Sequence, residues 1–213
     1  MPLNAAVLTF REFVMKEELP LASIHAGVFE FLRERDDAII FGAQAVNAYV
    51  DEPRMTQDID VMSTQAAELA QELRDYLNKR FYIAVRVGKI GGGKGYRLYQ
   101  VLKSGNRHLV DIRAVKQLPA AQRIEEVLVM APTELVASKV ISYYQRRGRP
   151  KSGTDWRDIA MLLLAFPELK RMTSPVTAHL QAAGVKSAIM TVWEEFVKQE
   201  IQPLEEDDED QWW

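Results

Sequence analysis

Apolar and polar positions follow two different periods along the chain, and the changes of period mark the predicted elements. Residues 66–79 place Leu69, Leu73 and Leu77 on one side, which predicts an amphipathic helix. Residues 96–102 alternate between apolar and polar side chains, which is typical of a half-buried strand. The same analysis predicts helical structure over residues 1–35 and 43–49, and strands over residues 38–41, 58–62, 81–87, 108–115 and 126–130.

The pattern becomes entirely helical after residue 131. Pro132 suits the first turn of a helix over residues 133–147. Thr154 is a candidate N-cap for the helix that follows. The later helices are expected over residues 155–166, 176–183 and 186–199. We therefore expect an α/β domain with N-terminal helices over residues 1–131, a helical domain over 132–203, and a disordered acidic tail over 204–213.

The composition is that of an ordinary water-soluble chain. The 213 residues are 47% hydrophobic and 27% charged, which is enough to bury a core without crosslinks. The absence of cysteine excludes disulfides and thiolate metal sites. No apolar run approaches the roughly 20 residues that span a bilayer. The N-terminus lacks a basic segment followed by a long apolar run, so we expect no signal peptide and a cytoplasmic location.

The net charge of −3 hides a basic body. Residues 205–210 are six consecutive acids, and without them the net charge would be +3. Basic side chains gather at Arg146, Arg147, Arg149 and Lys151. A mildly basic body with a local basic patch suits a phosphate-bearing ligand, although the patch is also compatible with a solvated loop.

The candidate chemistry starts with two carboxylates. Asp58 and Asp60 are two positions apart in a predicted strand, so they point to the same face. Acids are 30 of the 213 residues, so about four such pairs are expected by chance, and the pair alone also fits a solvated strand end. The context favours a site, because the Gly42 turn and the Arg54-x-Thr56 loop precede the pair. Neighbouring carboxylates repel unless a cation joins them, and Mg²⁺ is a natural choice.

Asp111 is the expected third carboxylate. It lies in the middle of a predicted strand with apolar neighbours, and a charge there needs a partner. It either lies beside the strand of Asp58 and Asp60 and shares their metal, or it lies on an edge strand and pairs with Arg107 or Arg113.

Two consecutive helices in the C-terminal half carry complementary charges. Lys139 shares a helix face with Arg146, and Asp155 and Asp158 begin the next helix. In one interpretation Lys139 contacts a triphosphate and Asp155 or Asp158 orients it. In the other, the two helices carry solvated salt bridges.

Two other patterns in the sequence, a glycine run and the histidines, do not support a functional site. The run from Gly88 to Lys94 resembles a phosphate-binding P-loop, but Gly95 replaces the required Ser or Thr and a strand follows instead of a helix. We interpret it as a flexible hairpin connection. The three histidines, His25, His108 and His179, show no metal-ligand spacing, and no Ser/His/Asp arrangement is evident.

Taken together, these motifs resemble a known superfamily. The Gly42-Ala43 turn, the Arg54-x-Thr56-x-Asp58-Ile59-Asp60 segment and the later Val110-Asp111-Ile112 segment resemble the polymerase-β-type nucleotidyltransferases. The Lys139 helix, with Arg146-Arg147 and then Asp155-x-x-Asp158, is similar to the AbiEii branch, the toxin-like nucleotidyltransferases of bacterial toxin–antitoxin and phage-defence systems. The resemblance covers residues 39–164. It departs at Ala43, where the superfamily has Gly or Ser, so the hydroxyl is absent although the backbone N–H remains.

The resemblance implies a fold and an activity. The fold would be α/β (α+β), a mixed sheet flanked by helices and followed by a helical domain. The activity would move a nucleoside monophosphate from an NTP to a hydroxyl of RNA, such as a tRNA end, or of a protein. Two Mg²⁺ ions would bind Asp58, Asp60 and Asp111, with Lys139 as a further catalytic residue. The nucleotide-binding residues would be Gly42, Ala43, Arg54, Thr56, Lys139, Arg146, Asp155 and Asp158.

Other functions remain open from the sequence. A protein antitoxin is a possible partner, and no membrane is expected. The alternatives are a small-molecule nucleotidyltransferase of the antibiotic-modifying kind, and a catalytically inactive nucleotide-binding or antitoxin protein.

Overall fold

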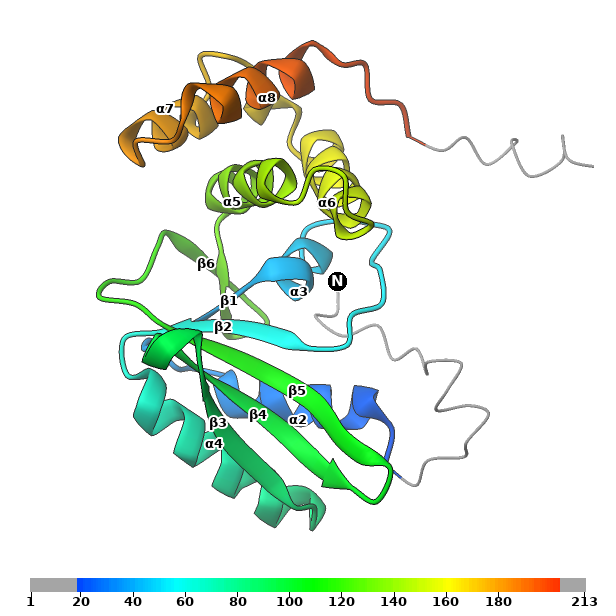
Figure 1. The fold of residues 1–213 in the computed structure, drawn as a ribbon, viewed down its shortest axis with the longest axis vertical. Coiled ribbons are helices and arrows are strands. Elements are labelled where there is room, and N and C mark those ends of the chain that lie inside the picture. Colours follow the sequence, from blue (N-terminus) through cyan, green and yellow to red (C-terminus); the bar gives the residue numbers. More distant parts are fainter. Residues whose placement is uncertain (1–18, 204–213) are drawn as a thin grey trace, which may run out of the picture. The chain divides into compact units, whose positions relative to one another are not determined.

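The computed structural model describes residues 19–203, which fold into a mixed sheet with helices and a following group of helices (Figure 1). The chain divides into two compact units, of which the first ends at Ala131 and the second begins at Pro132. The elements of the first unit are α2 (Leu21–Leu32), β1 (Ala38–Phe41), α3 (Gly42–Asn47), β2 (Ile59–Ser63), α4 (Ala66–Phe81), β3 (Val85–Ile90), a 3₁₀ turn (Gly91–Gly93), β4 (Gly95–Leu102), β5 (Gly105–Ala114), β6 (Ala121–Ile124) and β7 (Val127–Met130). Those of the second unit are α5 (Pro132–Gln145), α6 (Lys151–Ala165), a 3₁₀ turn (Pro167–Leu169), α7 (Pro175–Ala182) and α8 (Ser187–Lys198).

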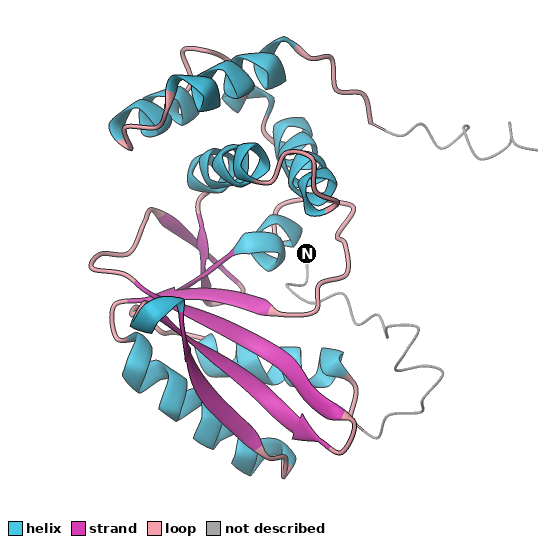
Figure 2. Cartoon of the chain, in the orientation of Figure 1, coloured by secondary structure: helices cyan, strands magenta, loops and turns pink. Residues whose placement is uncertain are grey.

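The seven strands of the first unit form a single sheet in the order β3-β4-β5-β2-β1-β7-β6. Strand β2 runs parallel to β5, and β1 runs parallel to β7, whereas the other neighbouring strands are antiparallel. Figure 2 shows the strands of this sheet in magenta. The mixed sheet with flanking helices confirms the predicted fold class.

Helices α2 and α4 lie on the same face of the sheet (Figure 1). The predicted stripe of α4 is buried, since Leu69, Leu73 and Leu77 expose at most 1% of their surface. Ile24 and Val28 of α2 are also fully buried. This burial fixes which face of each strand is apolar, and the alternation along β2 and β5 leaves the polar side chains of those strands on the other face.

The second unit packs its helices around an indole. Trp193 of α8 is fully buried, and its Nε1 donates a hydrogen bond to Thr177 Oγ1 of α7 at 2.7 Å. A buried indole N–H needs such a partner, so this contact fixes how α8 lies on α7. Pro132 is the first residue of α5, in agreement with its predicted place in the first turn.

Some element boundaries differ from the prediction. Helix α6 begins at Lys151, so Thr154 is not a cap, and its hydroxyl donates to the Lys151 carbonyl at 2.8 Å. The strand predicted over residues 81–87 is wrong in its first half, because α4 continues to Phe81 and Tyr82 ends it in the left-handed conformation with φ 55°. Strand β6 was not predicted.

The helix predicted before Leu19 and the tail over residues 204–213 lie outside the described residues. Within the described part, none of the helices combines the length and the apolar character that crossing a membrane requires.

Candidate active site

The strand register brings four side chains into one row across the sheet. Phe41 on β1 pairs with Asp60 on β2, Asp60 pairs with Asp111 on β5, and Asp111 pairs with Arg97 on β4. Residues directly opposite each other on neighbouring strands point to the same face. Asp58 precedes β2 by one residue and lies two positions before Asp60, so it also belongs to this face. We call Phe41, Asp60, Asp111 and Arg97 the polar row.

Asp111 lies on an interior strand, between β4 and β2. The alternative that placed it on an edge strand beside Arg107 or Arg113 is therefore wrong. Its partner is Arg97, whose Nε and Nη2 donate to the two carboxylate oxygens, each at 2.7 Å. This two-point geometry is the strongest that an arginine and a carboxylate can form.

The charge of Asp111 is strongly stabilised. Burial raises the pKa of Asp111, but hydrogen bonds from Arg97 and His108, together with the positive charge of Arg97, lower the pKa of this carboxyl well below its usual range. The hydrogen bonds to Asp111 raise the pKa of Arg97 in turn. The negative charges of Asp58 and Asp60 raise the pKa of Arg97 further. Asp111 is therefore an anion at any physiological pH.

A β-bulge brings His108 to the same face. Leu98 pairs with Val110 and Tyr99 pairs with His108, so Leu109 is an extra residue in β5. In a regular strand, residues three positions apart point to opposite faces, but the extra residue reverses the alternation. As a result His108 Nε2 lies 2.8 Å from Asp111 Oδ1, and its Nδ1 lies 3.3 Å from Asp58 Oδ2.

Asp58, His108 and Asp111 form a group that can hold a metal ion. One ligand atom from each lies within 4.8 Å of the others. Carboxylate oxygens suit hard cations such as Mg²⁺ and Mn²⁺, and the imidazole nitrogen suits transition metals. Asp60 is not part of this group but is the register neighbour of Asp111. The spacing of the histidines along the chain gave no indication that His108 lies in this group.

Gly42 approaches Asp60 so closely that a side chain at this position would force Asp60 to move. Its φ is +72°, in the left-handed region, and a Cβ added there would overlap Asp60 Oδ2. Helix α3 begins at Gly42, and Ala43 is its second residue. The turn therefore lies directly against the second carboxylate of the predicted pair.

The Arg54–Thr56 loop is fastened to α3. Asn47 donates from Nδ2 to the Arg54 carbonyl at 2.8 Å, and its Oδ1 accepts from the Arg54 backbone N–H at 3.1 Å. Gln44 Nε2 donates to Thr56 Oγ1 at 2.6 Å. These three hydrogen bonds tie the loop that leads into Asp58 to helix α3, which begins at Gly42. The loop and the Gly42 turn are therefore held next to each other.

The site residues that the sequence predicted in the second unit form ion pairs with one another. Lys139 Nζ lies 2.6 Å from Asp158 Oδ2 and 3.8 Å from Asp155 Oδ1. Arg146 Nη1 donates to Asp155 Oδ2 at 2.8 Å. The salt bridges of the second interpretation are therefore present between α5 and α6, but Asp155 and Asp158 expose at most 2% of their surface, so their carboxylates are buried and not solvated. Buried charges need such pairing.

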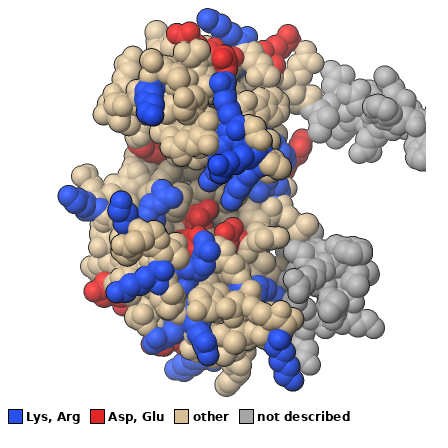
Figure 3. Space-filling model, in the orientation of Figure 1, with Lys and Arg blue, Asp and Glu red and all other residues tan. Residues whose placement is uncertain are grey.

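The basic patch is partly neutralised. In Figure 3, Lys and Arg side chains gather over α6 on the face drawn. Arg146 pairs with Asp155, and Arg147 Nη2 donates to Glu195 Oε2 at 2.7 Å while it lies over the Tyr143 ring. Two of the four predicted patch residues therefore have carboxylate partners within the unit.

Comparison with known proteins identifies the family. Residues 29–212 match the sequence profile described as "Nucleotidyl transferase AbiEii toxin, Type IV TA system". The chain belongs to the AbiEii nucleotidyltransferase family. The resemblance inferred from the motifs is thereby confirmed. The curated proteins gave no match.

Solved structures of low identity share the fold of this AbiEii-family chain. The Megavirus polyadenylate synthase superposes with a TM-score of 0.58 at 13% identity, over 75% of this chain and 36% of that chain. JHP933 from Helicobacter pylori gives 0.52 at 8% identity, over 90% and 92% of the two chains. A putative nucleotidyltransferase from H. pylori gives 0.53 at 10% identity, over 89% and 91%. The chain thus spans about a third of the viral enzyme, and these likenesses concern the fold alone.

Sequence reasoning missed two site residues of this AbiEii-family chain, Arg97 and His108. Arg97 is 14 positions from Asp111, and only the antiparallel register of β4 and β5 makes them neighbours. His108 would have been assigned to the opposite face of β5 without the bulge at Leu109. The sequence carries no local signal for either feature.

The Gly42 turn leads to a stability prediction. Gly42→Ala should lower the free energy of unfolding by about 1–3 kcal/mol, because the new Cβ meets the Asp60 carboxylate at a positive φ. The neighbouring Ala43→Gly is the matched control and should cost only about 0.5–1 kcal/mol through helix propensity. Urea denaturation measures both, and equal losses in the two variants would contradict the close-approach argument.

The Asp111–Arg97 pair leads to a pH prediction. A carboxyl whose pKa is lowered in the folded state adds stability above its unfolded pKa, about 3.9, and loses it as the pH falls towards the folded pKa. Arg97→Gln removes the main hydrogen-bond donor, so stability should fall less steeply below about pH 4 than in the wild type. Urea midpoints between pH 7 and pH 2 test this. The exposed Arg86→Gln on β3 should keep the wild-type slope.

Proposed function

We propose that this protein transfers a nucleoside monophosphate from an NTP to an acceptor hydroxyl with the help of Mg²⁺. The observation that carries the proposal is the meeting of Asp58 and Asp111 within 4.8 Å, with Asp60 opposite Asp111 and against the Gly42 turn. Membership of the AbiEii nucleotidyltransferase family supports the reaction class.

The donor set fits a divalent cation. Asp58, Asp60 and Asp111 offer carboxylate oxygens on one face of the sheet, and His108 adds a nitrogen beside two of them. Two Mg²⁺ ions held by the three carboxylates would withdraw charge from the triphosphate and lower the pKa of the acceptor hydroxyl. The low pKa of Asp111 suits a ligand, and a carboxyl with so low a pKa is a poor proton acceptor, so the role of general base is not assigned to it.

In the proposed reaction the acceptor oxygen forms a bond to the α-phosphorus of the NTP. The bond from that phosphorus to the oxygen bridging the β-phosphate breaks, and pyrophosphate leaves with the bonding electrons. The hydroxyl proton passes to solvent water. The backbone N–H groups of Gly42 and Ala43, with Arg54 and Thr56, are assigned to the phosphates.

Lys139 and Arg146 are assigned to the charge that develops on the pyrophosphate. The buried carboxylate of Asp158 fixes the Lys139 ammonium, and that of Asp155 fixes the Arg146 guanidinium. Asp155 and Asp158 are therefore positioning residues in this proposal.

The biological setting belongs to the same proposal. The acceptor is an RNA, such as a tRNA end, or a protein side chain, and the protein acts in the cytoplasm as the toxin of a toxin–antitoxin or phage-defence pair. The family description, which names a toxin of a type IV system, supports this assignment. A protein antitoxin would then be its partner.

A transfer assay tests the reaction. The full chain is incubated with each α-³²P-labelled NTP, Mg²⁺, and either total RNA or cell extract. We expect label in an acceptor with one NTP, and a loss of at least about 100-fold in Asp60→Asn and in Asp111→Asn. Asp75→Asn, an exposed acid of α4, is the control and should keep full activity. Transfer that persists in an Asp58→Ala/Asp60→Ala variant would exclude the metal assignment, and no transfer to any acceptor would favour a nucleotide-binding protein.

Metal binding can be measured without the reaction. Mn²⁺ is a spectroscopic substitute for Mg²⁺, and its free concentration is read by electron paramagnetic resonance. His108→Ala should weaken Mn²⁺ binding by roughly 10-fold and Asp111→Asn by more, since each removes one ligand atom from the group. His179→Ala, in the second unit, should leave binding unchanged. Equal Mn²⁺ affinities in all these variants would place the metal elsewhere.

A further inference from the structure

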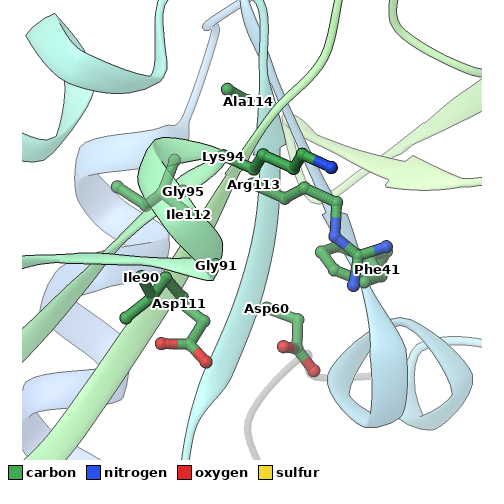
Figure 4. A pocket seen from close by; sticks show the side chains of 10 residues that line it. All are labelled: Phe41, Asp60, Ile90, Gly91, Lys94, Gly95, Asp111, Ile112, Arg113 and Ala114. Atoms are coloured by element: carbon green, nitrogen blue, oxygen red, sulfur yellow. The ribbon is translucent and has the colours of Figure 1, made fainter.

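A cavity lies beside the polar row in the first unit. Its volume is about 450 Å³, within the range of about 300–1,000 Å³ that small-molecule sites occupy. Figure 4 shows its walls, which come from the polar-facing side of β1, β2 and β5 and from the turn between β3 and β4. Asp60 and Asp111 form one part of the lining, and Lys94 and Arg113 form another.

The strand directions show on which side of the carboxylates the cations lie. Arg113 follows Asp111 by two residues on β5 and pairs with Met62 on β2, which follows Asp60 by two residues. Asp58 lies on the opposite side of Asp60 along the same strand. Since β1 runs antiparallel to β2 and Phe41 pairs with Asp60, Gly42 continues towards the Asp58 side. The cations and the phosphate-binding turn therefore lie on opposite sides of the polar row.

Neither of the two cations has a carboxylate partner among the residues that the structure describes. Among the ion pairs between residues 19 and 203, none includes Lys94 or Arg113, although Asp60 and Asp111 line the same cavity. The Arg113 guanidinium lies over the Phe41 ring, 4.9 Å from its centre, which holds it in place without neutralising it. Both side chains are exposed and available to a ligand.

A glycine brings the Lys94 turn close to the sheet. Gly95 pairs with Arg113, and a Cβ added there would lie 2.7 Å from the Ile112 carbonyl oxygen. Lys94 is thereby held next to the strand that carries both Asp111 and Arg113. The cavity is a formed feature of the first unit, with a carboxylate end and a cationic end that line the same space.

We propose that this cavity receives the acceptor, whose hydroxyl lies near Asp60 and Asp111 and whose neighbouring phosphate pairs with Lys94 and Arg113. The inference rests on the proposed nucleotidyl transfer and adds the cavity and the two cations that would hold the acceptor. A molecule that carries a hydroxyl and a phosphate a few bonds apart, as a nucleotide does, matches both ends. A polycationic acceptor, such as an aminoglycoside, would meet Lys94 and Arg113 with like charge.

Binding of a phosphate-bearing probe tests the proposal directly. The probe is a 5′-fluorescein hexa-adenylate RNA with a free 3′ hydroxyl, followed by fluorescence anisotropy at low salt with Mg²⁺ present. Lys94→Glu and Arg113→Glu should each weaken binding at least 10-fold. Lys89→Glu is the matched control, since Lys89 is an exposed lysine of the same hairpin whose register places it on the other face of the sheet, and it should stay within twofold.

The competitors distinguish the sources of the phosphate. Displacement of the RNA by AMP at millimolar concentration, with loss of AMP binding in Lys94→Glu, would identify a nucleotide as sufficient. Displacement by longer RNA alone would identify the phosphodiester chain of an RNA end. Tight binding of kanamycin, or RNA binding that is equal in all variants or absent from the wild type, would overturn the proposal. Thermal melting of each variant confirms that the chain is folded.

The transfer reaction separates the two proposals. Asp60→Asn should lose transfer yet still bind the RNA probe. If the wild type transfers label and Lys94→Glu and Arg113→Glu transfer it with unchanged acceptor KM, the cavity assignment fails while the activity stands. If the cavity binds the probe as expected but no NTP supports transfer, the activity fails.

Discussion

The parallel pairing of β2 with β5 is the constraint on which the candidate site depends. These two strands are far apart in the chain, and their register alone sets Asp60 opposite Asp111. Helices α2 and α4 bury the apolar side of both strands, so a shift by one residue would turn the carboxylates into the core. Hydrophobic burial on one face thus specifies the position of the acids on the other.

The acids in turn require compensation. Carboxylates on neighbouring strands repel each other, and in this structure basic side chains lie beside them. Arg97 of β4 donates two hydrogen bonds to Asp111, and His108 lies between Asp111 and Asp58. In the proposed reaction a divalent cation would compete with these contacts, and Arg97 and His108 would then affect how tightly the metal binds.

The sequence was sufficient for features that depend on short-range periodicity. The stripe of α4 and the shared face of Asp58 and Asp60 follow from fixed geometric periods, and Pro132 marks its helix by local chemistry. The sequence was insufficient for contacts that depend on how distant strands pair. Arg97 meets Asp111 only through strand pairing, and α6 begins at Lys151, three residues before the predicted cap Thr154.

The bulge at Leu109 has a consequence for how this chain is compared with its relatives. The extra residue divides β5 into two segments of opposite phase, one that carries His108 and one that carries Asp111. If a relative lacks the extra residue, an alignment that matches Asp111 without a gap before it would equate His108 with a side chain on the buried face. Comparison of the histidine position therefore has to follow the strand pairing with β4, because counting residues back from the carboxylate gives the wrong side of the sheet.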